Sequence, residues 1–118
     1  MPAIPASVPV VRQQIDELLD SLERPIPRAQ DIRLAVTEAC ANAVVHAYPP
    51  GVVGEVTVTA QTITDRLAVT VRDFGGGIQP GRRTGQLGLG LPLIHALADV
   101  VSVRDANPGV SVQMVFQL

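Results

Sequence analysis

Twelve consecutive residues in the first half of the chain decide how the rest is read: Thr37-Glu38-Ala39-Cys40-Ala41-Asn42-Ala43-Val44-Val45-His46-Ala47-Tyr48. As an α-helix, this stretch places Glu38, Asn42 and His46 one turn apart, so their side chains form a single polar stripe. The other positions are almost all apolar, which is typical of a helix buried on most sides. A carboxylate and an amide on such a helix need partners, because an unpaired buried polar group costs about 1–3 kcal/mol. Either the protein or a bound ligand must supply them.

Two glycine-rich segments further along the chain favour a ligand. The first is Asp73-Phe74-Gly75-Gly76-Gly77-Ile78, and the second is Gly85-Gln86-Leu87-Gly88-Leu89-Gly90-Leu91. Seven of the ten glycines lie between residues 75 and 90. Backbone with so little side-chain cover can approach a ligand closely. The polar stripe and the two glycine segments, in this order, are the features around which we interpret the chain.

The composition bounds the class of protein. With 118 residues, 47% of them hydrophobic but only 3% aromatic, the chain is expected to form one domain (residues 1–118) with an aliphatic core. A net charge of −2 without any basic run argues against a nucleic-acid surface. No stretch is long and apolar enough for a membrane span, and we find no signal peptide. The single Cys40 excludes an internal disulfide and is expected to be a small buried hydrophobe. Together these features predict a cytoplasmic protein.

Hydrophobic periodicity predicts alternating helices and hairpins. Apolar spacings of three and four predict amphipathic helices over residues 8–22, 28–47 and about 90–98, with Ser7 as the cap of the first. Period-two alternation predicts strands over residues 55–60, 67–73, 100–104 and 110–116, paired in sequence as two hairpins. This order predicts an α+β fold, a two-layer α/β sandwich whose mixed, mostly antiparallel sheet is covered on one face by helices.

The polar residues suit the two ends of a nucleotide. Asn42 offers an amide oxygen to Mg²⁺, a hard cation that takes oxygen ligands and neutralises phosphate charge. Asp73 is an acceptor when ionised, so it suits the amino group of adenine, and Gly75 and Gly77 allow the backbone to approach the base. Glu38 lies one turn before Asn42, where it could act as a base near the terminal phosphate.

The second glycine segment is placed for phosphate binding. Gly85, Gly88 and Gly90 come just before a helix start, where free N–H groups and the helix dipole favour anions. The chain has no lysine, so a P-loop is excluded. Phosphate charge must therefore be met by Mg²⁺, by backbone N–H groups or by arginines, of which Arg82 and Arg83 lie between the two glycine segments.

Three other motif interpretations of the sequence are not supported by the rest of the chain. Asp73-Phe74-Gly75 spells the metal-binding triplet of eukaryotic-type protein kinases, but the strand lysine and the catalytic loop of that fold are missing. The spacing from Gly85 to Gly90 is the reverse of the dinucleotide-binding fingerprint. His46 and His95 have neither a cysteine cluster nor a third histidine to complete a metal site.

The three segments resemble the motifs of the GHKL (Bergerat-fold) ATPase and kinase family. Glu38-x-x-x-Asn42-x-x-x-His46-Ala47 is similar to its N box, Asp73-x-Gly75-x-Gly77 to its first glycine box, and Gly85-x-x-Gly88-x-Gly90-Leu91 to its second. The small size, the phrase Val71-Arg72-Asp73 and the spelling Asn42-Ala43-x-x-His46-Ala47-Tyr48 look most like bacterial anti-sigma factor serine/threonine kinases of the SpoIIAB/RsbW type.

The resemblance implies a set of site residues. Glu38 would be the catalytic base and Asn42 the Mg²⁺ ligand. The residues implied to bind ATP are Asn42, His46, Asp73, Gly75, Gly77, Ile78, Arg82, Arg83, Gly85, Leu87, Gly88, Leu89, Gly90 and Ser111. The family often has threonine after the glycine of the last hairpin, where this chain has Val110 followed by Ser111. The segment between the glycine boxes is short, which leaves a small lid over the phosphates.

The resemblance also implies partners. They are a sigma factor that is sequestered and a STAS-type anti-anti-sigma protein that is phosphorylated on serine or threonine. Dimers of such kinases often involve a first strand that is nearly absent here, so the resemblance leaves both a monomer and a homodimer possible. An alternative, motivated by the short lid, is a nucleotide-gated partner-binding module with little or no phosphotransfer. A third alternative is a stable α+β domain without a ligand.

Overall fold

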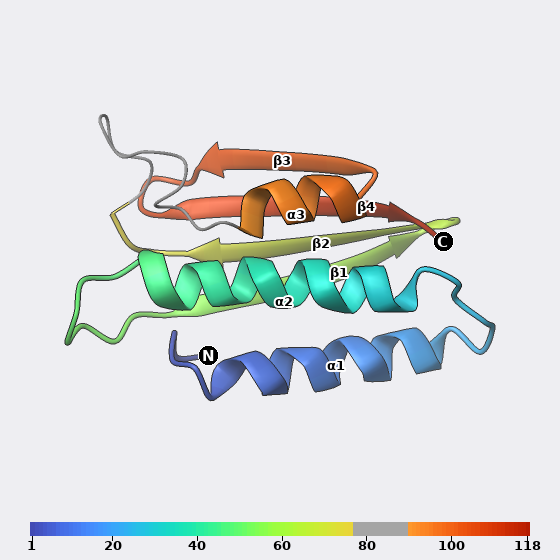
Figure 1. Cartoon of the computed structure of the whole chain (residues 1–118), viewed down its shortest axis with the longest axis horizontal. Coiled ribbons are helices and arrows are strands. Elements are labelled where there is room, and N and C mark those ends of the chain that lie inside the picture. The colour runs from blue at the N-terminus through green and yellow to red at the C-terminus, as the bar shows by residue number, and fades with distance from the viewer. Residues whose placement is uncertain (77–89) are drawn as a thin grey trace.

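In the described part of the chain, three helices cover one face of a four-stranded sheet (Figure 1). The computed structural model describes residues 1–76 and 90–118. In this part of the chain the elements, in order, are α1 (Ser7–Ser21), α2 (Ala29–His46), β1 (Val56–Ile63), β2 (Arg66–Asp73), α3 (Gly90–Leu97), β3 (Val100–Asp105) and β4 (Val110–Gln117). The predicted two-layer α+β sandwich is confirmed, and no helix in the described ranges could cross a membrane.

The sheet has the strand order β1-β2-β4-β3. The two predicted hairpins, β1 with β2 and β3 with β4, are joined by a central pairing of β2 with β4. All three pairings are antiparallel, so the parallel component of the expected mixed sheet is absent among the described strands. The turn of the first hairpin holds Thr64 at a φ of 54°, in the left-handed region.

The core lies between α2 and the centre of the sheet. On β2, Leu67, Val69 and Val71 are buried while the residues between them are not, as expected for a strand with one covered face. The buried face of α2 is rich in small side chains, which let the helix lie close to the strands: Ile32, Ala35, Val36, Ala39, Cys40 and Ala43. Cys40 is fully buried, as predicted, and burial raises the pKa of its thiol.

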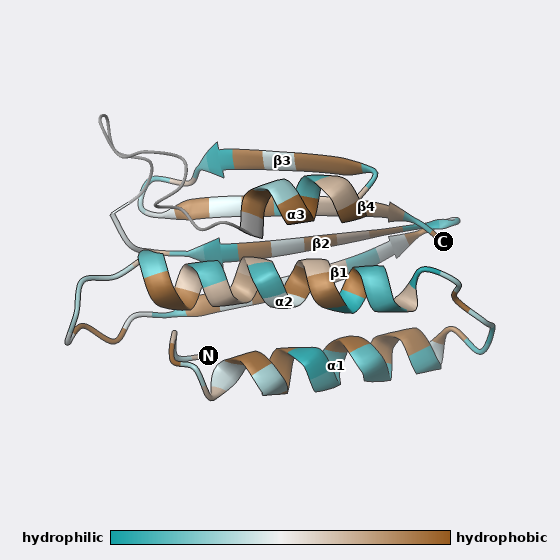
Figure 2. Ribbon diagram, viewed as in Figure 1, coloured by the Kyte–Doolittle hydropathy of each residue, from teal (hydrophilic) through white to brown (hydrophobic). Residues whose placement is uncertain are grey.

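The opposite face of α2 is exposed. Leu34 and Val45 have 41% and 66% of their surface exposed to solvent. The expectation of a helix buried on most sides is therefore wrong. The physical reason is the two-layer architecture: the sheet covers one face of α2 and the helices α1 and α3 flank it, which leaves its outer face open (Figures 1 and 2).

The N-terminal residues pair with the edge of β1. Pro2 bridges to Glu55, and the Ala3 N–H donates to the Gly54 carbonyl at 2.8 Å. Ser7 is not the cap predicted for α1. It lies inside the helix, and its hydroxyl donates to the Pro2 carbonyl at 2.6 Å, which holds the N-terminal segment in place. The first strand that the sequence nearly lacks is thus reduced to a single bridge.

One ion pair joins the start of α2 to the region after α3. Arg28 lies 2.5 Å from the Asp99 carboxylate and also donates to the Leu97 carbonyl. Asp99 accepts the Gln117 N–H at 2.6 Å. This backbone hydrogen bond, reinforced by Arg28, lowers the pKa of Asp99. The charged cluster therefore fixes α2 against the end of β4.

Phe116 tests the core directly. It is fully buried on β4, in register with Leu67 of β2. We expect Phe116→Ala to lower the free energy of unfolding by about 3–5 kcal/mol, because a large cavity is left behind. The measurement is urea unfolding followed by circular dichroism. Ile63→Ala, at a side chain that is 56% exposed, is the control and should cost less than about 1 kcal/mol. Equal losses would contradict this location of the core.

Candidate functional site

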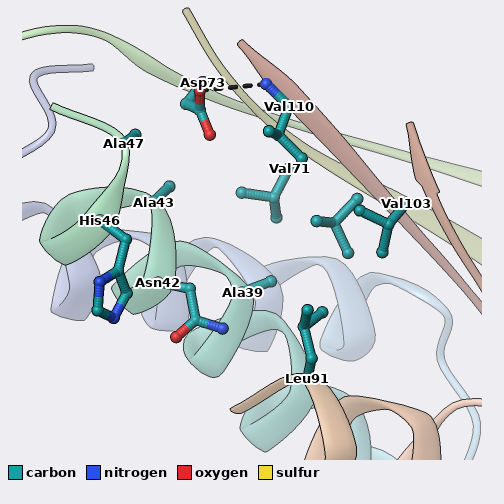
Figure 3. A pocket seen from close by; sticks show the side chains of 11 residues that line it. Ala39, Asn42, Ala43, His46, Ala47, Val71, Asp73, Leu91, Val103 and Val110 are labelled. Carbon is teal, nitrogen blue, oxygen red and sulfur yellow. Dashed lines mark hydrogen bonds between the residues drawn. The ribbon is translucent and has the colours of Figure 1, made fainter. Parts of the chain in front are cut away.

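A pocket opens beside α2, between this helix, the start of α3 and one end of the strands (Figure 3). Its lining residues are Ala39, Asn42, Ala43, His46, Ala47, Val71, Asp73, Leu91, Val103, Val110 and Val112. Aliphatic walls with a few polar groups are typical of a pocket for a small organic ligand.

The polar stripe of α2 reaches this pocket. Asn42 and His46 line it, and Glu38 lies one turn earlier on the same helix, half-buried and outside the lining. Within residues 1–76 and 90–118, no hydrogen bond or ion pair engages the side chain of any of the three. The described part of the protein therefore supplies no partner, and these partly exposed side chains are open to water or to a ligand.

Asp73 provides the polar group on the opposite wall. It ends β2, and only 7% of the residue is exposed. Its Oδ1 accepts the N–H of Gly75 at 3.0 Å and the N–H of Val110 at 3.2 Å, so the carboxylate is held by both its own turn and β4. Within the described residues Oδ2 accepts no hydrogen bond, and the carboxylate faces the pocket across from Asn42 (Figure 3). One oxygen is fixed and the other is available to a ligand.

Two glycines let the backbone close around Asp73. A Cβ on Gly75 would lie 1.9 Å from the Ala47 carbonyl oxygen, at the end of α2. Gly109 has a φ of 88°, and a Cβ there would lie 1.9 Å from the Asp73 carbonyl oxygen. Gly75 was expected to admit a ligand, but its close neighbour here is the helix end. Gly109 was not among the site residues predicted from the sequence.

Many of the predicted nucleotide-binding residues lie outside the described residues: Gly77, Ile78, Arg82, Arg83, Gly85, Leu87, Gly88 and Leu89. The short lid predicted between the glycine boxes lies there too. Gly90 is described and begins α3, as predicted. The next residue, Leu91, lines the pocket, so the end of the second glycine box reaches the same site as the polar stripe and Asp73.

Ser111, which the resemblance placed among the nucleotide-binding residues, lies outside the pocket lining. Its neighbours Val110 and Val112 both line the pocket. Side chains alternate along a strand, so Ser111 belongs to the other face of the sheet, in register with Arg72 and Arg104. The family's threonine corresponds to Val110, and Ser111 comes one residue later; in a strand, a shift of one residue changes the face of the sheet.

The apolar lining was missed by the sequence reasoning. Val71, Val103 and Val112 occupy adjacent register positions on β2, β3 and β4 and form one wall. Their alternation identified them as residues of a buried face. Which part of that face lines a pocket follows only from the pairing of β2 with β4, for which the sequence holds no local signal.

Comparison with known proteins finds relatives that match almost the whole chain. Residues 1–116 match the family model of the histidine kinase-like ATPase domain. The serine-protein kinase RsbW of Bacillus velezensis is 36% identical over an alignment of 129 positions, which covers 97% of this chain and 80% of that protein. RsbW of Bacillus subtilis (strain 168) is 34% identical, with the same coverage.

Solved structures show the same fold. The histidine kinase domain of a blue-light activated kinase from Erythrobacter litoralis aligns with a TM-score of 0.66 and 28% identity, over 80% of this chain and 46% of that one. The RsbU and RsbW domains of a Mycobacterium tuberculosis protein align with a TM-score of 0.78 and 23% identity, over 100% of this chain and 30% of that one. This chain spans less than half of either structure, and the second likeness concerns the fold alone.

Gly109 tests how the pocket is closed. We expect Gly109→Ala to destabilise the protein and to weaken binding of ADP, because the new Cβ would displace Asp73. Gly51→Ala is a matched control, because Gly51 also has a positive φ of 82° but nothing lies within 4 Å of an added Cβ. Only the strain of the left-handed backbone should then lower the free energy of unfolding, by about 1–2 kcal/mol. Thermal unfolding and calorimetric titration with ADP measure both effects. The same loss of stability in both variants, with ADP affinity intact, would refute the close packing of Gly109 on Asp73.

Proposed function

The chain belongs to the histidine kinase-like ATPase family, and on this premise we propose that it is an anti-sigma factor with ATP-dependent protein serine/threonine kinase activity. Its relatives at 34–36% identity are serine-protein kinases, which supports the kinase activity. The observation that carries the proposal is the joint placement of Asn42, His46 and Asp73 around one pocket. Within the described residues, the side chains of Asn42 and His46 and one carboxylate oxygen of Asp73 have no hydrogen-bond partner in the protein.

Asp73 would recognise the adenine end of ATP. With Oδ1 held by two backbone N–H groups, Oδ2 can accept a hydrogen bond from the exocyclic amino group of adenine. The valines and alanines of the lining would enclose the flat faces of the base. A buried carboxylate that already has two donors is pre-organised, so little freedom is lost when the base binds.

Asn42 would lie toward the phosphate end. Its amide has no partner within the described residues, and an amide oxygen is a suitable ligand for Mg²⁺. The cation supplies charge neutralisation for the phosphates when bound. Since the chain has no lysine, Arg82 and Arg83 remain the candidate side-chain cations for the phosphates, as expected from the sequence.

Glu38 would serve as the base for phosphotransfer. It removes the proton from a serine or threonine hydroxyl of the protein substrate as the hydroxyl oxygen forms its bond to the terminal phosphorus. The bond from that phosphorus to the bridging oxygen breaks, and ADP leaves. Glu38 suits this role because it is half-buried, unpaired within the described residues and one turn from Asn42.

The partners follow from the family resemblance. We propose that the phosphate acceptor is a STAS-type anti-anti-sigma protein and that the chain sequesters a sigma factor in the cytoplasm. The alternative is a nucleotide-gated module of the same fold that transfers little phosphate. Incubation with labelled ATP and a STAS protein encoded beside this chain separates the two. Stoichiometric transfer of label to the STAS protein supports the kinase, and tight nucleotide-dependent binding without transfer supports the module.

Asp73→Asn tests the adenine contact. The amide is nearly isosteric, but it loses the charge and can turn a donor toward the adenine amino group. We expect affinity for ADP to fall about ten- to a hundredfold, since a hydrogen bond to a charged group contributes about 1.5–3 kcal/mol. Titration calorimetry measures the affinity, and circular dichroism checks that the variant is folded. A folded variant with the parental dissociation constant would remove Asp73 from the site.

Glu38→Gln tests the catalytic base. The change keeps size and shape, so we expect near-parental ATP affinity while phosphotransfer falls about 10²- to 10⁴-fold. Melting temperature, ATP affinity and phosphotransfer are measured on the same preparation. Glu17→Gln, at an exposed position on α1, is the control and should change none of them. A destabilised Glu38 variant with full turnover per folded molecule would mean that this carboxylate is structural.

A further inference from the structure

Tyr48, the only tyrosine of the chain, makes three hydrogen bonds with one hydroxyl. The hydroxyl donates to the Glu55 carbonyl at 2.5 Å. It accepts the Glu55 N–H at 3.1 Å and the Phe74 N–H at 2.9 Å. A phenol hydroxyl has one proton and two acceptor positions, so all of its hydrogen-bonding capacity is used. Three segments therefore meet at this oxygen: the end of α2, the start of β1 and the turn after β2.

The bond to Phe74 ties the turn at Asp73 to the end of α2. It joins residues that are 26 positions apart in the chain. Next to it, the Gly76 N–H donates to the Ala47 carbonyl at 3.4 Å, and Gly75 packs against the same carbonyl. The ring of Tyr48 rests on Gly54, where an added Cβ would lie 2.0 Å from a ring carbon. The side chain is thus held on its ring and on its hydroxyl.

The hydrogen bonds of Tyr48 connect the elements that form the two opposite walls of the pocket. Asn42 and His46 come from α2, whereas Asp73 comes from the end of β2, and a ligand that reaches both walls needs them at a fixed separation. Tyr48 follows α2 and binds the residue after Asp73, yet it does not line the pocket. Groups that are held in their bound arrangement before the ligand arrives lose less freedom on binding, so loosening them lowers affinity.

We propose that Tyr48 is a positioning residue for nucleotide binding: its hydroxyl sets the Asp73 turn against the helix that carries Asn42 and His46. The inference rests on the proposed use of Asp73 for the adenine end. A purely structural role, closing the loop between Tyr48 and Glu55, would affect stability and leave nucleotide binding unchanged.

Tyr48→Phe separates the two roles, since it removes the hydroxyl and leaves the ring on Gly54. Ser7→Ala is a matched control. It deletes a hydroxyl that donates a 2.6 Å hydrogen bond to the Pro2 carbonyl, and this bond does not involve the pocket lining. We expect both variants to melt a few degrees lower. Only Tyr48→Phe should bind ADP about tenfold more weakly and show a KM for ATP raised about tenfold, with kcat changed less than threefold.

Parental ADP affinity and KM in folded Tyr48→Phe would overturn the proposal. If the parent binds ADP without transferring phosphate, the kinase function fails while the ADP comparison still decides the role of Tyr48. If the parent binds no adenine nucleotide, both proposals fail together.

A second measurement needs no substitution. Growth on 3-fluorotyrosine labels position 48 alone, because the chain has one tyrosine. We expect the single fluorine resonance to shift as ADP is added, although Tyr48 lies outside the pocket lining. The ADP concentration at half of the shift should agree with the dissociation constant measured by calorimetry. A resonance that stays in place through saturation would show that the hydroxyl does not sense the Asp73 turn, which would overturn the proposal even if Tyr48→Phe failed to fold.

Discussion

The hydrogen bond from the Val110 N–H to the Asp73 carboxylate is the contact on which the site depends. It joins the last residue of β2 to the first residue of β4, two strands that the chain forms far apart in sequence. The same oxygen accepts the Gly75 N–H, so one carboxylate ends a strand, begins a turn and attaches a second hairpin. Gly109 makes this approach possible because it has no Cβ to clash with the Asp73 backbone.

Helix α2 meets the sheet with one face and the pocket with another. Its alanines and Cys40 allow close packing on the strands, while Asn42 and His46 lie toward the open end. Because the site is shared between a helix and a strand end, its geometry depends on how these elements are fixed to each other. Arg28 and Asp99 fix the beginning of α2, and Tyr48 with the Ala47 carbonyl fixes its end.

The chemistry proposed for the site follows from its unpaired groups. Asn42, His46 and one Asp73 oxygen have no protein partner in the described residues, and all three residues line a pocket with aliphatic walls. A ligand with a flat base at one end and charged phosphates at the other satisfies both groups.

The sequence by itself determined the local elements and the family. Period-two alternation located all four strands, apolar spacings located the three helices, and short turns paired each hairpin, because these features depend on neighbours in the chain. Only the tertiary structure decided how the hairpins join. The β2–β4 register moved Ser111 off the pocket face and brought Val110 to Asp73, and the two-layer packing left Leu34 and Val45 exposed. The three bonds of the Tyr48 hydroxyl and the close approach at Gly109 likewise join residues far apart in sequence, for which local periodicity holds no signal.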